Sequence, residues 1–216
     1  YDPPEQLGAD RWLSLVGMLS DFTADACRDA PGGLMLATFG TATTIDTATP
    51  DAVAPDTIAM PASNRTATRD VQPAGAARRP AAWAFRGGLI LPGPAMMHSA
   101  LARGTALLPD ADGEVADYPT RTLDAIASGI AAAQAGALVR QWAVGLKRHG
   151  QPPRVYVTGG GWPALADEVK RQLAHAQAQA GVAQRPARWL PAPVLDGLAA
   201  MARSGVGAAA SAGVAQ

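Results

Sequence analysis

The sequence has a single cysteine, Cys27, so no disulfide can form within the chain. A chain without internal disulfides is typical of a reducing compartment, and we expect a cytoplasmic protein. No apolar stretch reaches the roughly 18 residues that would span a bilayer, so we expect no membrane partner. Basic and acidic residues number 18 each and form no basic stripe, which argues against nucleic acid as a partner.

Several familiar functional motifs are also missing. No Gly-x-x-x-x-Gly-Lys-Ser/Thr run occurs, which excludes a P-loop protein. The three histidines, His98, His149 and His175, lack the spacing of metal ligands, and we expect a core or capping role for His98. The run Gly159 to Ala164 matches a dinucleotide-binding pattern, but no acidic residue follows about 20 positions on, so we reject that reading. The same turn could cover an adenine or ribose with bare backbone, or be an ordinary strand-to-helix turn.

The hydrophobic pattern predicts an α/β protein. Strands are expected at 34–39, 42–48, 85–93, 154–158 and 188–190, and helices at 94–106, 121–148, 163–178 and 194–201, after a first helix that opens near Asp10. A hairpin-led meander followed by alternating strands and helices gives a mixed sheet with flanking helices. That arrangement is consistent with a ribonuclease-H-like lobe.

Two segments lack such a pattern. Residues 49–82 contain five prolines among many Ala, Thr and Asp residues, so we expect a surface insertion at the tip of a hairpin. Residues 204–216 are rich in Gly, Ala and Ser, and we expect a disordered tail.

The run Gly40-Thr41-Ala42-Thr43-Thr44-Ile45-Asp46 joins two apolar segments. Glycine lets the backbone approach a ligand closely, and threonine supplies a hydroxyl for a phosphate oxygen. The run therefore indicates a nucleotide phosphate site, with a plain hairpin turn as the alternative.

A second candidate lies near the start of the chain, at Gly8-Ala9-Asp10-Arg11. One interpretation is a helix N-cap formed by Asp10 with Arg11 on the surface. The other is a general base beside an arginine that holds an anion.

Taken in order, these and further motifs resemble the type III pantothenate kinases, a family that includes the Bvg accessory factors. The matching segments are Tyr1 with 7–11, 40–46, 87–93, 104–109, Thr122 with Ile126 and Gly129, 157–160 and 195–198. Each motif alone is unspecific, whereas the ordered series, which spans most of the chain, is specific.

The resemblance implies the acetate and sugar kinase/Hsp70/actin fold, in which two ribonuclease-H-like lobes flank an ATP cleft. Residues 1–33 would be the remnant of the first lobe and 34–203 the second lobe. The implied reaction transfers the γ-phosphate of ATP to the terminal hydroxyl of pantothenate, the first step toward coenzyme A. The resemblance also implies Mg²⁺ or another divalent metal, and a homodimer.

The resemblance further implies roles for individual residues. Asp10 would be the general base. Tyr1, Gly8, Ala9, Asp10 and Arg11 would hold pantothenate, and Thr122 would reach it across the dimer interface. On the nucleotide side, Gly40, Thr41, Gly159 and Gly160 would contact ATP.

The chain departs from the family pattern in two places. The family's Asp-x-Gly-Asn-Thr phosphate motif is absent and is expected upstream of Tyr1, so we expect this chain alone to be inactive. Many members carry an Asp that binds K⁺ where this chain has Thr38, and a hydroxyl is a poorer cation ligand than a carboxylate. K⁺, NH₄⁺ or no cation therefore stay open. Two alternatives also stay open: a non-catalytic regulatory relative that binds nucleotide or a protein, and a different kinase of the same superfamily.

Overall fold

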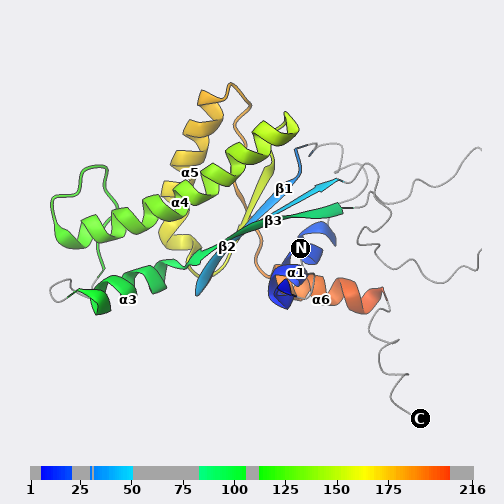
Figure 1. The fold of residues 1–216 in the computed structure, drawn as a ribbon, viewed down its shortest axis with the longest axis horizontal. Coiled ribbons are helices and arrows are strands. Elements are labelled where there is room, and N and C mark those ends of the chain that lie inside the picture. Colours follow the sequence, from blue (N-terminus) through cyan, green and yellow to red (C-terminus); the bar gives the residue numbers. More distant parts are fainter. Residues whose placement is uncertain (1–5, 21–29, 31, 51–82, 106–111, 205–216) are drawn as a thin grey trace, which may run out of the picture.

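A computed structural model describes residues 6–20, 30, 32–50, 83–105 and 112–204. Its elements are drawn in Figure 1. In chain order they are α1 (Ala9–Ser20), β1 (Leu34–Phe39), β2 (Ala42–Pro50), β3 (Trp83–Pro92), α3 (Pro94–Gly104), α4 (Thr122–His149), β4 (Arg154–Thr158), α5 (Trp162–Gln179), β5 (Arg188–Trp189) and α6 (Pro193–Arg203). Every strand and helix expected from the sequence is present, with ends that differ by a few residues.

The five strands form one mixed sheet in the order β3-β2-β1-β4-β5. Strand β2 runs antiparallel to both β1 and β3, whereas β4 is parallel to β1 and β5 is parallel to β4. This is the ribonuclease-H-like mixed sheet that the sequence predicted.

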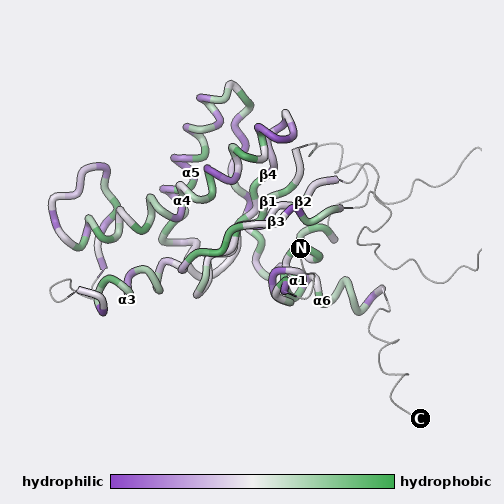
Figure 2. Tube along the Cα trace, in the orientation of Figure 1, coloured by the Kyte–Doolittle hydropathy of each residue, from purple (hydrophilic) through white to green (hydrophobic). Residues whose placement is uncertain are grey.

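One face of the sheet is covered by α4 and α5 (Figure 1). Because side chains alternate along a strand, Met35, Ala37 and Phe39 of β1 all point to this face. They pack in a buried cluster with Leu138 of α4 and Val169 of α5. Figure 2 shows the hydrophobic colouring that runs through the strands at the centre of the molecule.

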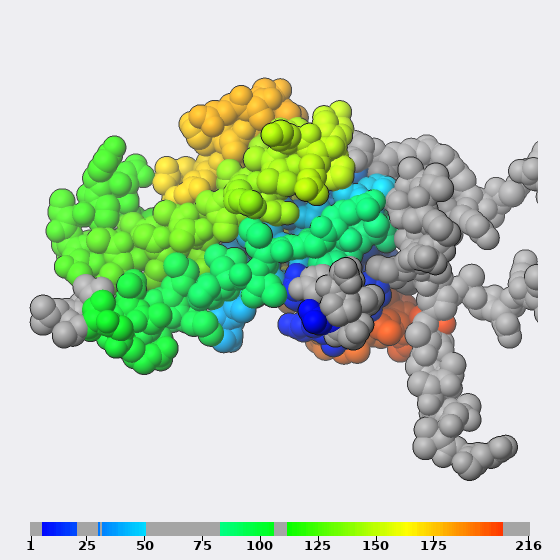
Figure 3. Space-filling view, in the orientation of Figure 1, coloured from blue at the N-terminus to red at the C-terminus, as the bar shows by residue number. Residues whose placement is uncertain are grey.

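The opposite face carries α1. Leu34 and Leu36 of β1 point this way and pack with Leu15 and Met18 of α1. Helix α6 packs along α1, and Figure 3 shows the two helices exposed together beneath the strands. We call this side of the sheet the α1 face.

The predicted insertion begins later than expected. Thr49 and Pro50 belong to β2 and pair with Ala84 and Trp83 of β3. The boundary at residue 49 was therefore wrong by two residues, because the β2–β3 ladder continues past the last apolar position. Residues 51–82 and 205–216 lie outside the described part of the chain, so the expected insertion and tail stay predictions.

Helix α4 corrects another expectation. By length and composition it is apolar enough to cross a membrane, with a mean hydropathy of 1.3 over its best window, one third of which is buried. The helix was expected at 121–148, but polar residues interrupt its apolar run, so its ability to span a bilayer by length and composition was not anticipated. A helix that packs on a sheet, as α4 does, meets the same criteria without entering a membrane.

Candidate active site

Three turns meet at one end of the sheet. They are residues 40–41 between β1 and β2, Gly93 between β3 and α3, and residues 159–161 between β4 and α5, and we call them the glycine edge. The amide of Gly93 donates to the carbonyl of Thr41 at 2.9 Å, and the amide of Gly161 donates to the carbonyl of Phe39 at 2.9 Å. The structure therefore brings the first and last of the predicted nucleotide motifs together.

Close packing explains why glycine occupies this edge. A Cβ atom on Gly93 would collide with the carbonyl oxygens of Gly40 and Thr41, and one on Gly159 would collide with backbone atoms of Phe39. Gly159 also has a φ of +99°, which side-chain-bearing residues rarely adopt.

Two helices begin at the glycine edge. Helix α3 starts at Pro94 and α5 at Trp162, and neither has a side-chain hydrogen bond that caps its N-terminus. The first amides of a helix lack intrahelical partners and carry the positive end of the helix dipole, so they attract phosphate. Gly40, Thr41, Gly159 and Gly160 thus lie where a polyphosphate could bind, although their contact with ATP stays a prediction.

A row of three threonines crosses three neighbouring strands next to this edge, on the α1 face. Thr38 of β1 lies opposite Thr44 of β2 on one side and opposite Thr158 of β4 on the other. Each is two residues from a side chain on the α1 face, so all three share that face. The predicted cation position at Thr38 is therefore bordered by hydroxyls on both neighbouring strands.

The N-terminus of α1 lies farther along the same face. Its first turn is closed by the amide of Trp12, which donates to the carbonyl of Gly8 at 3.0 Å. Asp10 is exposed, and a Cβ on Gly8 would lie 2.7 Å from its Oδ1 atom. An exposed carboxylate in the first turn is stabilised by the helix dipole and is accessible to a substrate.

Arg11 points the other way, into the protein. Its side chain is 7% exposed and pairs with Asp46 of β2, with Nη2 donating to Oδ1 at 2.5 Å and Nε donating to Oδ2 at 3.2 Å. Burial raises the pKa of the Asp46 carboxyl, while the hydrogen bond and charge of Arg11 act in the opposite direction. The surface position that one interpretation gave Arg11 is therefore wrong, and its contact with pantothenate stays a prediction.

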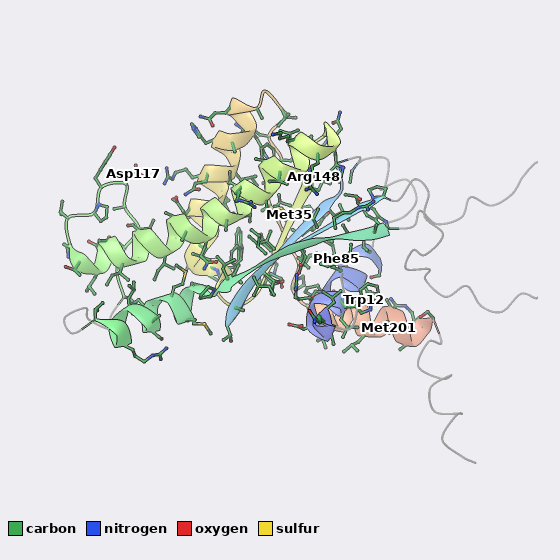
Figure 4. All side chains as sticks on the ribbon, viewed as in Figure 1. Trp12, Met35, Phe85, Asp117, Arg148 and Met201 are labelled. Atoms are coloured by element: carbon green, nitrogen blue, oxygen red, sulfur yellow. The ribbon has the colours of Figure 1, made fainter. Side chains whose placement is uncertain are left out.

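The remaining predicted site residues do not join this group. Thr122 is the first residue of α4, and this end of α4 projects beyond the sheet, away from α1 (Figure 1). Asp117, just before α4, lies far from Trp12 of α1 (Figure 4). Tyr1 lies outside the described residues. Thr122 therefore does not join Asp10 on the α1 face, and its role across a dimer interface stays a prediction.

The described residues offer no protein cage for a divalent metal: within them, no three His, Cys, Asp or Glu side chains come together. Mg²⁺ is commonly held by one or two carboxylates, several waters and the phosphates of the substrate. The donor set therefore fits a metal that arrives with the nucleotide.

Two cavities in the described part of the chain contain none of the predicted site residues. A cavity of about 510 Å³ is lined by Asp117 and Glu168, among others, on the α5 side. Another of about 340 Å³ lies between α3, α4 and α5 and includes the half-buried His98 in its wall.

Sequence reasoning missed two residues of the site. Asp46 ends the motif that was read for its glycine and threonines, and Gly88 lies opposite it on β3. Both residues lie in segments that resemble the family's motifs, 40–46 and 87–93, and this was the only feature of the sequence that pointed to them. It did not indicate which residues they contact.

Comparison with known proteins agrees with the resemblance. The family described as type III pantothenate kinase matches residues 81–144. Over 205 residues the chain is 50% identical to a type III pantothenate kinase from Bordetella bronchiseptica. This match covers 95% of this chain and 63% of that protein. Over 175 residues it is 39% identical to one from Cupriavidus pinatubonensis, covering 77% of this chain and 50% of that protein.

A solved structure of a Baf family protein from Campylobacter jejuni is also similar, with a TM-score of 0.46 and 15% sequence identity. That likeness covers 94% of this chain and 67% of the other. The chain spans 63% of the length of the Bordetella bronchiseptica relative.

Proposed function

We propose that this chain, which belongs to the type III pantothenate kinase family, forms the ATP-binding second lobe and the catalytic helix of an ATP-dependent pantothenate kinase. The observation that carries the proposal is that the glycine edge ends the same strands whose α1 face carries the threonine row and helix α1, on which Asp10 is exposed. A triphosphate anchored at the edge would extend along that face toward Asp10.

The reaction follows from this arrangement. Asp10 would take the proton of the terminal hydroxyl of pantothenate while the alcohol oxygen bonds to the γ-phosphorus of ATP. The bond from that phosphorus to the bridging oxygen breaks, and ADP leaves with 4′-phosphopantothenate as the other product. Phosphoryl transfer depends on positioning and charge neutralisation, and Mg²⁺ bound to the phosphates would supply part of the latter.

Roles for the neighbouring residues belong to the same proposal. Gly8, Ala9 and Arg11 would border the pantothenate site, with Tyr1 closing it. Gly40, Thr41, Gly159 and Gly160 would contact ATP. Because Thr38 has only threonines as strand neighbours on its face, we propose at most a weak dependence on K⁺ or NH₄⁺.

We propose a homodimer through α4. Ala125, Gly129, Ala132 and Gly136 recur at helical spacing, and the first three are exposed. A Cβ on Gly129 or Gly136 would meet nothing within 4 Å, so this face has room for another helix to approach closely. Such a dimer would carry Thr122 of one subunit toward the α1 face of its partner.

We further propose that residues 1–33 belong to a first lobe and 34–203 to a second. Helix α1 precedes β1 and packs against the α1 face of the sheet and against α6. The first lobe would lie on the outer side of α1. The chain alone would then lack one wall of the cleft and would be inactive. A cytoplasmic location stays a prediction.

The test is a coupled assay of ADP release by the full-length protein with ATP and pantothenate. We expect turnover, and we expect Asp10→Asn to lower kcat at least about 100-fold because the base is lost. Asp167→Asn is the matched control, since that carboxylate is fully exposed on α5, and it should leave kcat unchanged.

The same assay separates the alternatives. Binding of ATP and pantothenate without turnover would favour a regulatory relative. The specific argument for that alternative is that Thr38 stands where many family members carry a cation-binding Asp. Turnover with other alcohols but not pantothenate would point to a different kinase. Full activity of Asp10→Asn would contradict the assignment of the base.

A further inference from the structure

One charged pair joins the catalytic helix to the sheet. Arg11 and Asp46 are 7% and 3% exposed at their side chains and make two hydrogen bonds in a side-on geometry. The Arg11 guanidinium also lies 5.9 Å from the centre of the Phe85 ring. Figure 4 shows Phe85 on the side of the sheet that faces α1. A fork of this kind fixes direction as well as distance, because two parallel hydrogen bonds allow little rotation.

Strand β3 makes room for this pair. Asp46 lies opposite Gly88, and a Cβ on Gly88 would collide with Asp46 Oδ1 and with the Ile45 carbonyl. The ladder is irregular directly after this point, between Asp46 and Ala48, and Gly87 has a φ of +90°. A glycine pair and a bulge thus sit where the carboxylate needs space.

The pair bears directly on Asp10. Asp10 and Arg11 are consecutive in the first turn of α1, so their side chains leave the helix about 100° apart. When Arg11 is locked against the sheet, Asp10 must face outward along the α1 face. Thr44, a member of the threonine row, also hydrogen-bonds to Asp46, which links the same carboxylate to the proposed path of the phosphates.

We infer that Asp46 is a positioning residue for phosphoryl transfer: by holding Arg11, it sets the direction of Asp10 and the place of the acceptor alcohol. The inference rests on the proposed function. Asp46 itself is too buried to touch substrate. Its effect is therefore expected in the binding and orientation of pantothenate, and not in the binding of ATP at the glycine edge.

The experiment compares the full-length wild type with Asp46→Asn, using Asp167→Asn as the exposed control. We expect Asp46→Asn to raise the KM for pantothenate and lower kcat, each by about 10- to 100-fold, because a small displacement of the reacting groups is enough for this loss. The KM for ATP should stay within about twofold, as should all constants of the control.

A merely structural role predicts something different. Partial unfolding lowers the fraction of active protein, which reduces kcat and leaves both KM values unchanged. An unchanged KM for pantothenate in Asp46→Asn would therefore overturn the inference, as would an equal rise in both KM values.

A second measurement needs no variant. In the wild type, the Arg11 Nε–H should exchange slowly with solvent and shift when pantothenate binds, as followed by NMR. Exchange as fast as that of Arg103, an exposed residue of α3, would overturn the inference even if Asp46→Asn does not fold. If the wild type binds pantothenate without phosphorylating it, the proposed kinase activity is overturned but the role of Asp46 is not. That role is then tested by comparing the Kd for pantothenate of the wild type with that of Asp46→Asn. A wild type that does neither would overturn both.

Discussion

Arg11 and Asp46 are buried together beneath α1, and the balance between two opposing effects decides how this pair behaves. Burial in a poorly polar surrounding disfavours the charged carboxylate, whereas the guanidinium favours it. Burial is the larger effect on the pKa of Asp46, which lies above its ordinary value of 3.8.

The direction of this pKa shift gives a prediction for stability. The folded protein binds the Asp46 proton more tightly than the unfolded chain does, so this proton adds to the free energy of unfolding. The added free energy is fully present below the unfolded-state pKa of Asp46 and is lost as the pH rises through its folded-state pKa. Asp46→Asn has no such proton. The free energy of unfolding of wild type minus that of the variant should therefore shrink as the pH rises.

Urea unfolding of both proteins between about pH 4 and pH 7 measures this difference, and the other carboxyls cancel because both proteins contain them. A difference that grows with pH would mean that Arg11 outweighs burial and that the pKa is lowered.

The sequence singled out candidate side chains, but it did not give their partners. Asp10 and Arg11 were identified together, and the structure separates them into one exposed and one buried residue. That separation depends on Asp46, which lies 35 positions from Arg11, and on the space above Gly88. No local pattern encodes a contact of that span.

Among the elements, α1 and α6 pack closely against each other where they cross. Each helix contributes a glycine to the crossing. A Cβ on Gly17 would collide with the carbonyl of Pro193, and one on Gly197 with the carbonyl of Leu13. Trp12 of α1 and Met201 of α6 lie close together beneath the sheet in Figure 4.

We predict that Gly17→Ala and Gly197→Ala each destabilise the full-length protein by about 1–3 kcal/mol, because the added methyl meets backbone that cannot move aside easily. Chemical denaturation measures the change. Gly104→Ala at the end of α3 is the control, since its methyl would meet nothing within 4 Å, and it should be nearly neutral. Similar values for all three variants would show that the helices do not pack this closely.

The elements themselves were predictable because apolar spacing and turn residues are local signals. The hairpin of β1 and β2 and the order of later strands and helices followed from them. The end of β2 was not predictable in this way, since Thr49 and Pro50 are held by pairing with Ala84 and Trp83 of β3, which lie far along the chain. The crossing of α1 and α6 was not predictable from local signals either, because Gly17 and Gly197 lie far apart in sequence.

On the scale of the whole molecule, the described residues expose apolar or small side chains on two surfaces that bear on assembly. Leu195 and Leu198 of α6 are 65% and 48% exposed on the α1 side, where the proposed first lobe would lie. On the other side, α3 and the first half of α4 extend beyond the sheet, with the small residues of α4 facing outward (Figure 3). The first surface fits a lobe of the same protein and the second fits the proposed partner subunit.

The proposed dimer gives a prediction at this scale. Ala132→Arg should weaken self-association of the full-length protein, because a long charged side chain prevents close approach of two helices. Sedimentation velocity over a concentration series measures the effect. Ala178→Arg, at an exposed position near the end of α5, should leave association unchanged. An intact dimer in Ala132→Arg would place the interface elsewhere.

The central claim is that Asp10 faces the alcohol of pantothenate while the glycine edge holds the nucleotide. A crystal structure of the full-length protein with pantothenate and a non-hydrolysable ATP analogue tests it most directly. We expect an Asp10 carboxylate oxygen about 2.6–3.2 Å from the terminal hydroxyl, with the phosphates at Gly40 and Thr41. A hydroxyl beyond the reach of Asp10, or a nucleotide bound away from that edge, would contradict it.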